Sequence, residues 1–373
     1  KMLFLLIEAK LIVGSKGKSG LVRQALKVNI AKIAINTLNI RLFIKMTELE
    51  LLKKEILTVK TEDFEEIAFK VFFYQYKYNA FYRSLVDFWL KNPSKVSKIE
   101  QIPCLPIDFF KHKTLLSSSR KVEKIFESSG TTQSQKSKHY LSDLDFYTKN
   151  AIQIFENQYG SLSGFHIVAL LPSYLEQGAS SLVYMVEQFI KHANSTESGF
   201  YLYNHQELAE KLTILQEKND RKILLIGVTF ALLDFALACS INLSKAIVME
   251  TGGMKGRKKE MIRQEVHEIL QEKFQIKEVH SEYGMTELLS QAYSQGEGIF
   301  EMPNTMRVLL REYNDPFSLT RGKGLINVID LANVESCAFI ATQDVGEYVD
   351  DKHFKVLGRA DNSEQRGCNL MIG

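Results

Sequence analysis

The sequence predicts an α/β fold with a small β-rich subdomain near its end. Two observations support this prediction. Short apolar runs typical of buried strands alternate with longer helix-like segments over residues 143–287, and over residues 301–357 short strand-like runs separated by Gly and Asp replace the helices. In α/β folds, ligands gather where strands end at their carboxyl side, so residues that directly follow the strands are the first site candidates.

Composition and charge narrow the class of protein. The chain has 373 residues, of which 45% are hydrophobic, enough to bury a large core and to form more than one domain. Its net charge is +3, and residues 1–45 hold nine Lys or Arg against the single acid Glu8, so the remaining chain is acidic. An acidic body with a basic arm is not typical of a nucleic-acid scaffold, and we expect no nucleic-acid partner.

Cysteine usage indicates a reducing compartment. Cys104, Cys239, Cys337 and Cys368 are far apart and form no CxxC pair, which indicates neither a zinc site nor a disulfide framework. No apolar run reaches the roughly 20 residues that a membrane-spanning helix needs. We therefore expect a cytoplasmic protein.

The basic arm, residues 1–45, has two interpretations. It mixes Leu and Ile with Lys and contains GSKGKSG at residues 14–20, which favours an arm with at most peripheral contact with an anionic membrane. Alternatively, it is not part of the native folded protein, since Met46 precedes TELELLKKEIL, a run that is acidic first and basic later, as helix starts are.

The main elements follow from periodicity and from Pro and Gly. Aromatic side chains recur at three- and four-residue spacing over residues 48–90 and predict helices with a packed core face. Pro103 and Pro106 then favour an extended segment. Further along, the patterns predict a helix at 143–160, a strand at 165–172, a helix at 180–192, a strand at 222–228 that leads into an apolar helix, a strand at 245–253 and a basic helix at 257–274.

Residues 125–139 (IFESSGTTQSQKSKH) are the first candidate for ligand binding. A polyanion such as a triphosphate needs backbone N–H groups brought close by a residue without Cβ, hydroxyl donors and a cation at the rim. The segment supplies all three: Ser128, Ser129, Gly130, Thr131, Thr132 and Lys136. A flexible surface loop rich in Ser, Thr and Gly is the alternative interpretation.

Five motifs, in order along the chain, resemble those of the adenylate-forming, acyl-activating enzyme superfamily. The first is the Ser/Thr-rich phosphate loop, in which Gln133 and Gln135 stand where Gly and Pro are usual. YGMTE at residues 283–287 is similar to the aromatic-Gly-x-Thr-Glu signature of the superfamily. The others are Gly252-Gly253, Asp344 in TQDVG, and a Gly-Arg-x-Asp hinge at residues 358–361.

This resemblance implies a nucleotide site that uses ATP and Mg²⁺. It implies that Thr286 contacts the nucleotide phosphate and that Glu287 holds the magnesium ion, a role that suits a hard oxygen ligand. The remaining nucleotide-binding positions that it implies are Tyr283 and Gly284 in the signature, Gly252 and Gly253 beside the adenine, and Asp344 and Arg359 at the ribose.

The resemblance also implies an architecture. Members of the superfamily have a large N-terminal domain with mixed sheets flanked by helices, followed by a mobile C-terminal lid domain. Here the chain stops twelve residues after Asp361, so the lid domain is expected to be absent or truncated. We expect a basic arm at residues 1–45, an α/β adenylation core at 46–300, a β-rich subdomain at 301–357 and a hinge-like tail at 358–373.

Within the superfamily, the chain resembles the acyl-protein synthetases of bacterial fatty-acid reductase complexes, also called long-chain-fatty-acid–protein ligases. This resemblance covers residues 46–373 and rests on the missing lid and on the segments IPCLPIDFFKHK, GVTFALLDFA and RGCNLMIG. It implies that a long-chain fatty acid becomes acyl-AMP and then a thioester on Cys368, before transfer to an acyl-CoA-reductase-like or acyl-carrier partner. Cys368, Lys136 and Thr286 are the implied catalytic residues, and Arg366 would lower the thiol pKa of Cys368.

Other interpretations stay open at this stage. A free cysteine is most often a small buried apolar residue, which is the alternative for Cys368. The same motifs occur in aryl- or acyl-CoA ligases of the phenylacetate-CoA ligase kind. Gln133, Gln135 and the missing lid are also compatible with a non-catalytic nucleotide-binding subunit. Light production is one biological setting for such chemistry, and other aldehyde or acyl-transfer reactions are equally compatible with the sequence.

Overall fold

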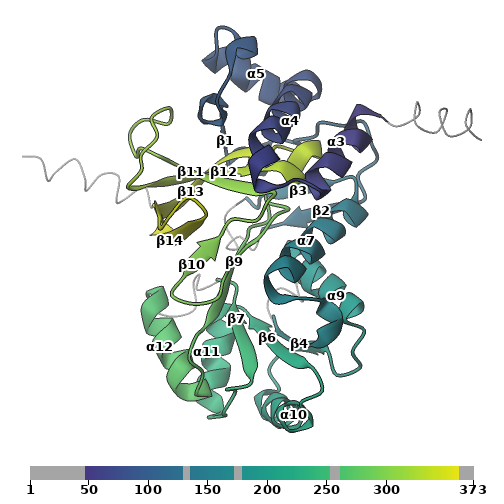
Figure 1. Cartoon of the computed structure of the whole chain (residues 1–373), viewed down its shortest axis with the longest axis vertical. Helices are drawn as coiled ribbons and strands as arrows, with labels where there is room; N and C mark the ends of the chain where they lie inside the picture. Colours follow the sequence, from purple (N-terminus) through teal and green to yellow (C-terminus); the bar gives the residue numbers. More distant parts are fainter. Residues whose placement is uncertain (1–46, 129–134, 172–178, 253–260, 361–373) are drawn as a thin grey trace, which may run out of the picture. The chain divides into compact units, whose positions relative to one another are not determined.

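The computed structural model describes residues 47–128, 135–171, 179–252 and 261–360 (Figure 1). The chain divides into two compact units, Lys1–Leu52 and Lys53–Gly373, and the described part of the first is residues 47–52. Helix α3 (Glu48–Leu57) begins in the first unit and ends in the second, with acidic residues in its first turn and a lysine in its last, as predicted. The sheets, the other helices and the candidate site belong to the second unit.

Two helices follow in the second unit, α4 (Phe64–Tyr78) and α5 (Ala80–Trp89). Asn79 separates them, because its backbone is extended and its side chain caps α5 by accepting from the Tyr82 N–H. The aromatic stripe of α4 belongs to the core, since Phe72 is fully buried and packs edge-on against the Tyr82 ring. The predicted helical region over residues 48–90, with its packed aromatic face, is confirmed.

Twelve strands form one mixed sheet in the described part of the chain, in the order β11-β12-β13-β14-β10-β9-β8-β7-β6-β4-β5, with β1 paired to β13. Neighbouring strands are parallel from β5 to β8 and antiparallel from β8 to β11. The strands are β1 (Leu105–Pro106), β4 (Phe165–Leu170), β5 (Gly199–Tyr201), β6 (Lys222–Gly227), β7 (Ala246–Glu250), β8 (His280–Tyr283), β9 (Ala292–Ser294), β10 (Ile299–Glu301), β11 (Met306–Arg311), β12 (Lys323–Asp330), β13 (Phe339–Tyr348) and β14 (His353–Arg359). The strand-rich region near the end of the chain thus continues the sheet through the β14–β10 pairing, and the domain boundaries inferred from the sequence stay a prediction.

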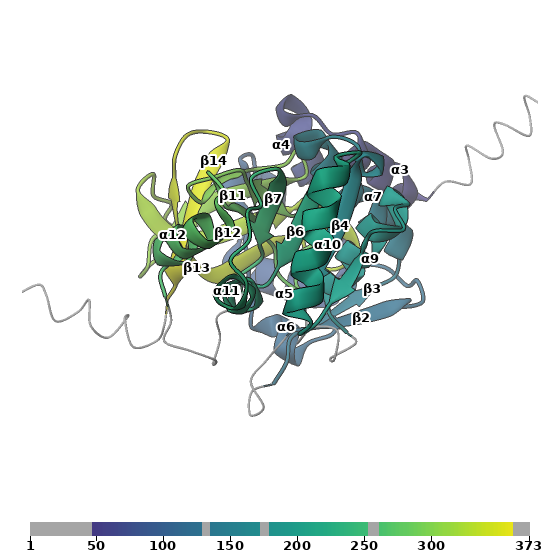
Figure 2. The same cartoon turned by 90° about the horizontal axis from the view of Figure 1, so that it is seen from below.

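Helices cover both faces of the parallel strands. They are α7 (Leu144–Tyr159), α9 (Ser181–Ala193), α10 (His205–Lys218), α11 (Thr229–Ala238) and α12 (Arg263–Phe274). Figures 1 and 2 show α11 and α12 on one side of these strands and α7 and α9 on the other. Every residue of β4 is buried, as expected for a parallel strand covered on both faces. The predicted α/β fold, a large mixed sheet flanked by helices, is confirmed.

Hydropathy adds one finding about these helices. None of those that the structure describes is long and apolar enough to cross a membrane.

Two local predictions are wrong. The segment around Pro103 and Pro106 is extended only in part, because a short helix, α6 (Phe109–His112), follows β1 closely. A proline restricts its own backbone and that of the residue before it, so it does not prevent a helical turn three residues later. The strand predicted over residues 245–253 ends at Glu250, and Gly252 beyond it has a left-handed φ of +72°.

The candidate phosphate loop joins the two strands of a separate small sheet. These strands, β2 (Lys124–Glu127) and β3 (Lys138–Leu141), pair antiparallel. At the base of the hairpin, the Ser128 N–H donates to the Ser137 carbonyl at 3.1 Å, and the Ser137 N–H donates to the Ser128 hydroxyl at 3.0 Å. The ends of the loop are therefore fixed to each other by reciprocal hydrogen bonds.

An extra residue in β14 determines the face on which Arg359 lies. Strands β13 and β14 pair with Asp344 opposite Arg359 and with Gly346 opposite Val356, which leaves one additional residue on β14. Side chains alternate along a strand, so a bulge of one residue reverses the alternation beyond it. Arg359 thus lies on the same face as Phe354, although five positions separate them.

Candidate functional site

Three parallel strands, β6, β7 and β8, end at the same edge of the sheet. Glu250 at the end of β7 lies beside Ser281 of β8, so Gly252 and the 283–287 segment leave the sheet at neighbouring positions. The Gly252 N–H donates to the Glu250 carboxylate at 2.7 Å, and the Gly252 carbonyl accepts from the Thr229 N–H at 3.0 Å. The predicted adenine-bordering residue Gly252 therefore lies at the kind of strand end where ligands bind in α/β folds.

Tyr283, Asp344 and Arg359 form one hydrogen-bonded group. The Tyr283 hydroxyl donates to Asp344 Oδ2 at 2.9 Å, and Arg359 Nε donates to Asp344 Oδ1 at 3.1 Å. Burial, followed by the Asp344 charge, raises the pKa of Tyr283 above its ordinary value, so this hydroxyl stays a donor. The Asp344 side chain is 9% exposed and that of Arg359 is 44% exposed. Asp344 is therefore a nearly buried acceptor whose orientation is fixed from two sides.

Glu287 is a buried carboxyl at the end of the 283–287 segment. Burial raises its pKa, while a hydrogen bond from the Ser137 hydroxyl and the charge of Arg359 oppose that shift. A cation beside such a carboxyl would favour the ionised form, so the donor chemistry of Glu287 fits a magnesium ion, which is commonly held by one or two carboxylates and by substrate phosphates. Groups of three or more His, Cys, Asp or Glu that could hold a metal are absent from the described residues.

The structure describes Ser128 and Lys136 of the predicted phosphate loop. Ser128 closes the base of the hairpin, and Lys136 Nζ lies 3.8 Å from Glu127 Oε2 with its side chain 38% exposed. The Gln135 amide donates to the Lys111 carbonyl at 2.7 Å, which ties the end of the loop to α6. The other predicted site positions lie outside the described residues: Ser129, Gly130, Thr131, Thr132, Gly253 and Cys368.

The base of the hairpin contacts the 283–287 segment. His139 Nδ1 lies 2.8 Å from the Thr286 carbonyl oxygen, and the Ser137 hydroxyl hydrogen-bonds to the Glu287 carboxyl. Through Tyr283, the same segment reaches Asp344 and Arg359. The structure thus brings together the hairpin base, the YGMTE segment and the β13–β14 pair, which are far apart in the sequence.

Comparisons with known proteins found similarity only to solved structures. A scan against protein-family models found no match, and a search of curated proteins found none. Among solved structures, the chain is similar to apo MatB from Rhodopseudomonas palustris, with 12% identity and a TM-score of 0.46 over 66% of this chain and 49% of that one.

Two further solved structures are similar to about the same degree. One is a long-chain-fatty-acid-CoA ligase, FadD1 from Archaeoglobus fulgidus, with 15% identity and a TM-score of 0.46 over 67% of this chain and 54% of that one. The other is McyG A-PCP complexed with phenylalanyl-adenylate, with 14% identity and a TM-score of 0.44 over 73% and 50%. The chain spans about half the length of these three proteins. At these TM-scores, the fold assignment rests on the sheet topology of the chain itself.

Gly284 of the signature lies close to the Glu282 carboxyl. A Cβ on Gly284 would collide with Glu282 Oε1, so a larger residue would displace that carboxyl. Burial and the negative charge of Glu250 raise the pKa of Glu282 to about 8. At neutral pH a protonated, uncharged carboxyl therefore lies directly behind the 283–287 segment.

Sequence reasoning missed three residues of this site: Ser137, His139 and Glu282. Glu282 directly precedes the signature, and that adjacency was the available signal. Ser137 and His139 lie in the candidate loop segment, but His139 contacts a backbone carbonyl 147 positions later in the chain. A contact with a backbone atom leaves no pairing of residue types in the sequence, so no motif marks it.

Proposed function

We propose that this chain is an adenylate-forming ligase, which uses ATP and Mg²⁺ to activate a carboxylic acid as an acyl-adenylate. The observation that carries the proposal is the convergence of the hairpin base, the 283–287 segment, Asp344 and Arg359. These are the segments that the sequence resemblance associates with phosphate, metal and ribose, and in the fold they lie in contact with one another. Such a reaction depends mainly on positioning and on electrostatic stabilisation.

Each residue of the site would have a distinct role. Glu287 would hold the magnesium ion, which would neutralise phosphate charge when bound, and Thr286 would contact the α-phosphate. Asp344 and Arg359 would bind the ribose hydroxyls, and Tyr283 would keep the Asp344 carboxylate in its orientation. Ser128, Ser129, Gly130, Thr131, Thr132 and Lys136 would hold the remaining phosphates, and Gly252 and Gly253 would border the adenine.

The finer proposal is that the chain is a long-chain-fatty-acid–protein ligase. A carboxylate oxygen of the fatty acid would attack the α-phosphorus of ATP, and pyrophosphate would leave. The thiolate of Cys368 would then attack the acyl carbon, forming a thioester and releasing AMP, before the acyl group passes to a reductase or to an acyl-carrier protein. The support for this finer proposal is the sequence resemblance over residues 46–373.

Labelling with a radioactive acid tests both levels of the proposal. The protein is incubated with ATP, Mg²⁺ and labelled tetradecanoate or phenylacetate, in the presence and in the absence of CoA. We expect tetradecanoate label that survives denaturation, is released by hydroxylamine and is lost in Cys368→Ser. Cys239→Ser is the matched control, because Cys239 is a partly exposed thiol remote in sequence from the tail. Label found only in a CoA thioester, and unaffected by Cys368→Ser, would contradict the finer proposal in favour of a phenylacetate-CoA-ligase-like enzyme.

A non-catalytic nucleotide-binding subunit is the second candidate. Gln133 and Gln135 favour it, because they replace the usual Gly and Pro of the phosphate loop and Gln135 is tied to α6. Exchange of labelled pyrophosphate into ATP decides between the two. Measurable ATP binding without exchange, across a panel of fatty and aromatic acids, would establish the non-catalytic subunit and exclude the ligase.

A further inference from the structure

We infer that His139 is a positioning residue, which holds Thr286 and Glu287 in their binding geometry before any ligand arrives. This inference rests on the proposed function, because it assigns His139 to the same site. His139 lies on β3, directly beyond the candidate phosphate loop, and its Nδ1 is 2.8 Å from the Thr286 carbonyl oxygen. The His139 side chain belongs to the described core and is 1% exposed.

The contact is one of several that hold the backbone of residues 286–290 from different elements. Asn333 Nδ2 donates to the Glu287 carbonyl at 2.8 Å, and Asn150 Nδ2 donates to the Leu289 carbonyl at 2.8 Å. Asp330 Oδ2 accepts from the N–H groups of Leu289 and Ser290 at 2.7 and 3.0 Å. His139, Asn150, Asp330 and Asn333 are all buried. Buried networks of this kind rigidify the segment that they satisfy, so Thr286 and Glu287 are preorganised.

His139 has a defined tautomer in this network. A carbonyl oxygen only accepts, so Nδ1 must carry the proton that is donated to Thr286. Burial lowers the pKa of His139 to about 4, against the weaker opposing effect of the Thr286 hydrogen bond, so the ring is neutral at physiological pH. Nε2 is then an acceptor. The neutral ring adds no positive charge next to Glu287, where the metal would bind.

His139 also lines a small cavity of about 20 Å³, enough for a single water molecule. Ser142 and Ser336 line it too, and their hydroxyls, like His139 Nε2, are buried without a hydrogen-bond partner within the described residues. One ordered water could donate to Nε2 and accept from a serine hydroxyl. This arrangement would keep the proton on Nδ1.

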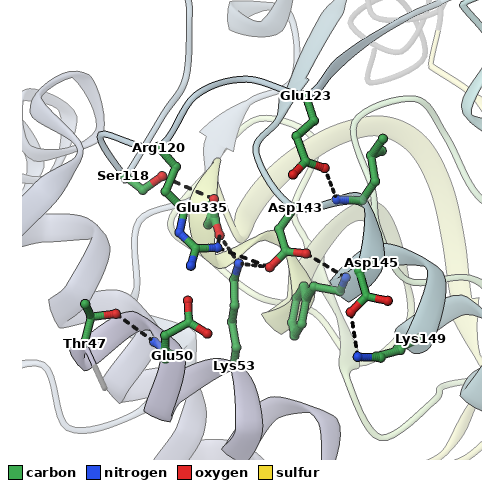
Figure 3. A network of polar contacts seen from close by, with 12 residues as sticks. Thr47, Glu50, Lys53, Ser118, Arg120, Glu123, Asp143, Asp145, Lys149 and Glu335 are labelled. Atoms are coloured by element: carbon green, nitrogen blue, oxygen red, sulfur yellow. Dashed lines mark hydrogen bonds and ion pairs between the residues drawn. The ribbon is translucent and has the colours of Figure 1, made fainter. Parts of the chain in front are cut away.

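A partly buried ion-pair network lies beside the cavity. Figure 3 shows Lys53 pointing between Asp143 and Glu335, with Arg120 close to the same two carboxylates. Lys53 Nζ lies 2.7 Å from Asp143 Oδ2 and also contacts Glu335 Oε1, while Arg120 lies 3.2 Å from Asp143 and 3.6 Å from Glu335. Lys53, Asp143 and Glu335 line the same cavity as His139. These ion pairs therefore connect α3, α7 and the 331–335 turn next to the cavity that His139 lines.

Two substitutions of similar size distinguish the role of Nδ1 from that of Nε2. In His139→Asn the amide nitrogen takes the place of Nδ1, and in His139→Gln it takes the place of Nε2. We expect His139→Asn to keep the Thr286 contact, with a KM for MgATP within threefold of the wild type in pyrophosphate exchange. We expect His139→Gln to raise that KM at least tenfold and to leave the KM for the carboxylic acid unchanged. Both variants lose the ring, so a general loss of packing affects them alike.

Hydrogen exchange gives a second readout that needs no activity. The amides of Leu288, Leu289 and Ser290 are hydrogen-bonded in the folded protein, so release of the Thr286 carbonyl should increase their exchange in His139→Gln but not in His139→Asn. Equal exchange in both variants, or a normal KM for MgATP in His139→Gln, would overturn the inference. If the wild type exchanges no pyrophosphate with any acid, the proposed function fails, and amide exchange alone then decides whether His139 holds the segment.

Discussion

The pKa values of two neighbouring carboxyl groups, Glu250 and Glu282, are shifted in opposite directions. Burial raises the pKa of Glu250, but the nearby His267, the charge of Arg263 and the hydrogen bond from the Gly252 N–H outweigh burial and hold that pKa at about 2. Burial and the negative charge of Glu250 raise the pKa of Glu282 to about 8. At neutral pH, one member of the pair is ionised and the other is protonated.

The raised pKa of Glu282 predicts a pH-dependent stability. An unfolded glutamate ionises near pH 4.3, so the contribution of the protonated group is complete below that pH and is lost as pH rises towards 8. Glu282→Gln keeps a neutral side chain of the same shape at every pH. Between pH 5 and pH 8, the unfolding free energy of the wild type should therefore fall by about 3 kcal/mol relative to that of the variant. Urea denaturation at both pH values measures this difference. The exposed Glu301→Gln is the control, and a gain for Glu282→Gln that does not change with pH would contradict the prediction.

Asp344 is the residue whose loss should weaken nucleotide binding most directly. A hydrogen bond to a charged group contributes about 1.5–3 kcal/mol, so Asp344→Asn should lower kcat/KM for ATP at least tenfold. Tyr283→Phe removes only the hydroxyl that orients the carboxylate, and its effect should be smaller. Pyrophosphate exchange at varied ATP concentration provides the measurement, with Asp350→Asn at an exposed turn of the same hairpin as the control. An unchanged KM for ATP in Asp344→Asn would exclude a ribose-binding role.

Site residues could be predicted from the sequence where they belong to a motif. Tyr283, Asp344 and Arg359 were identified separately through the resemblance, and the structure places them within hydrogen-bonding distance. Their roles towards a nucleotide stay a prediction. His139 and Asn333 could not be found in this way, because both act on backbone carbonyls, which every residue carries.

At the scale of elements, the end of β7 depends on a glycine. Gly252 has a φ of +72°, and a Cβ at this position would meet no atom within 4 Å. The cost of Gly252→Ala should therefore come from the left-handed backbone alone, about 1–2 kcal/mol. Gly164→Ala is a matched control, since Gly164 also has free space and needs no such φ. Urea midpoints compare the two variants, and equal midpoints would mean that the strand end adjusts its backbone.

Most helices and strands could be predicted, because burial of one face gives the sequence a periodic pattern of apolar residues and burial of both faces gives a continuous apolar run. Strands such as β4 and β6 and helices such as α7 and α9 occur where their patterns indicate. The helical turn α6 was missed, since four residues are too few to express a period. The pairing of β14 with both β10 and β13 was also not predictable, because it depends on partners that lie elsewhere in the chain.

At the scale of the second unit, one sheet connects the parallel and antiparallel halves. The connection runs from β8 through β9 and β10 to β14, so each half is hydrogen-bonded to the other along one side. We expect the unit to unfold in one cooperative transition. Trp89 is the single tryptophan of the chain, and its ring lies 5.0 Å from that of Phe317 beside the antiparallel half. Its fluorescence and the far-UV circular dichroism should therefore give the same urea midpoint, and two separate midpoints would refute a single transition.

The α/β class of this unit follows from the alternation of strand and helix patterns, and the structure confirms it. The continuity of the sheet does not follow from those patterns. Short strands such as β9 and β10 have too few residues for their sequence to indicate which neighbours they pair with. Only the fold as a whole decides that pairing.

The bulge in β14 matters for anyone who aligns this chain with others. Leu357 is the residue without a counterpart on β13, and it accounts for the five-residue spacing between Phe354 and Arg359, whose side chains share one face of the sheet. Removing either Leu357 or Gly358 would leave a regular ladder with the same Asp344–Arg359 pair, because one residue would then separate Val356 from Arg359. The spacing between Phe354 and Arg359, counted in residues, is therefore a poor guide to equivalence, because a chain with one residue fewer at this bulge would keep the same pair.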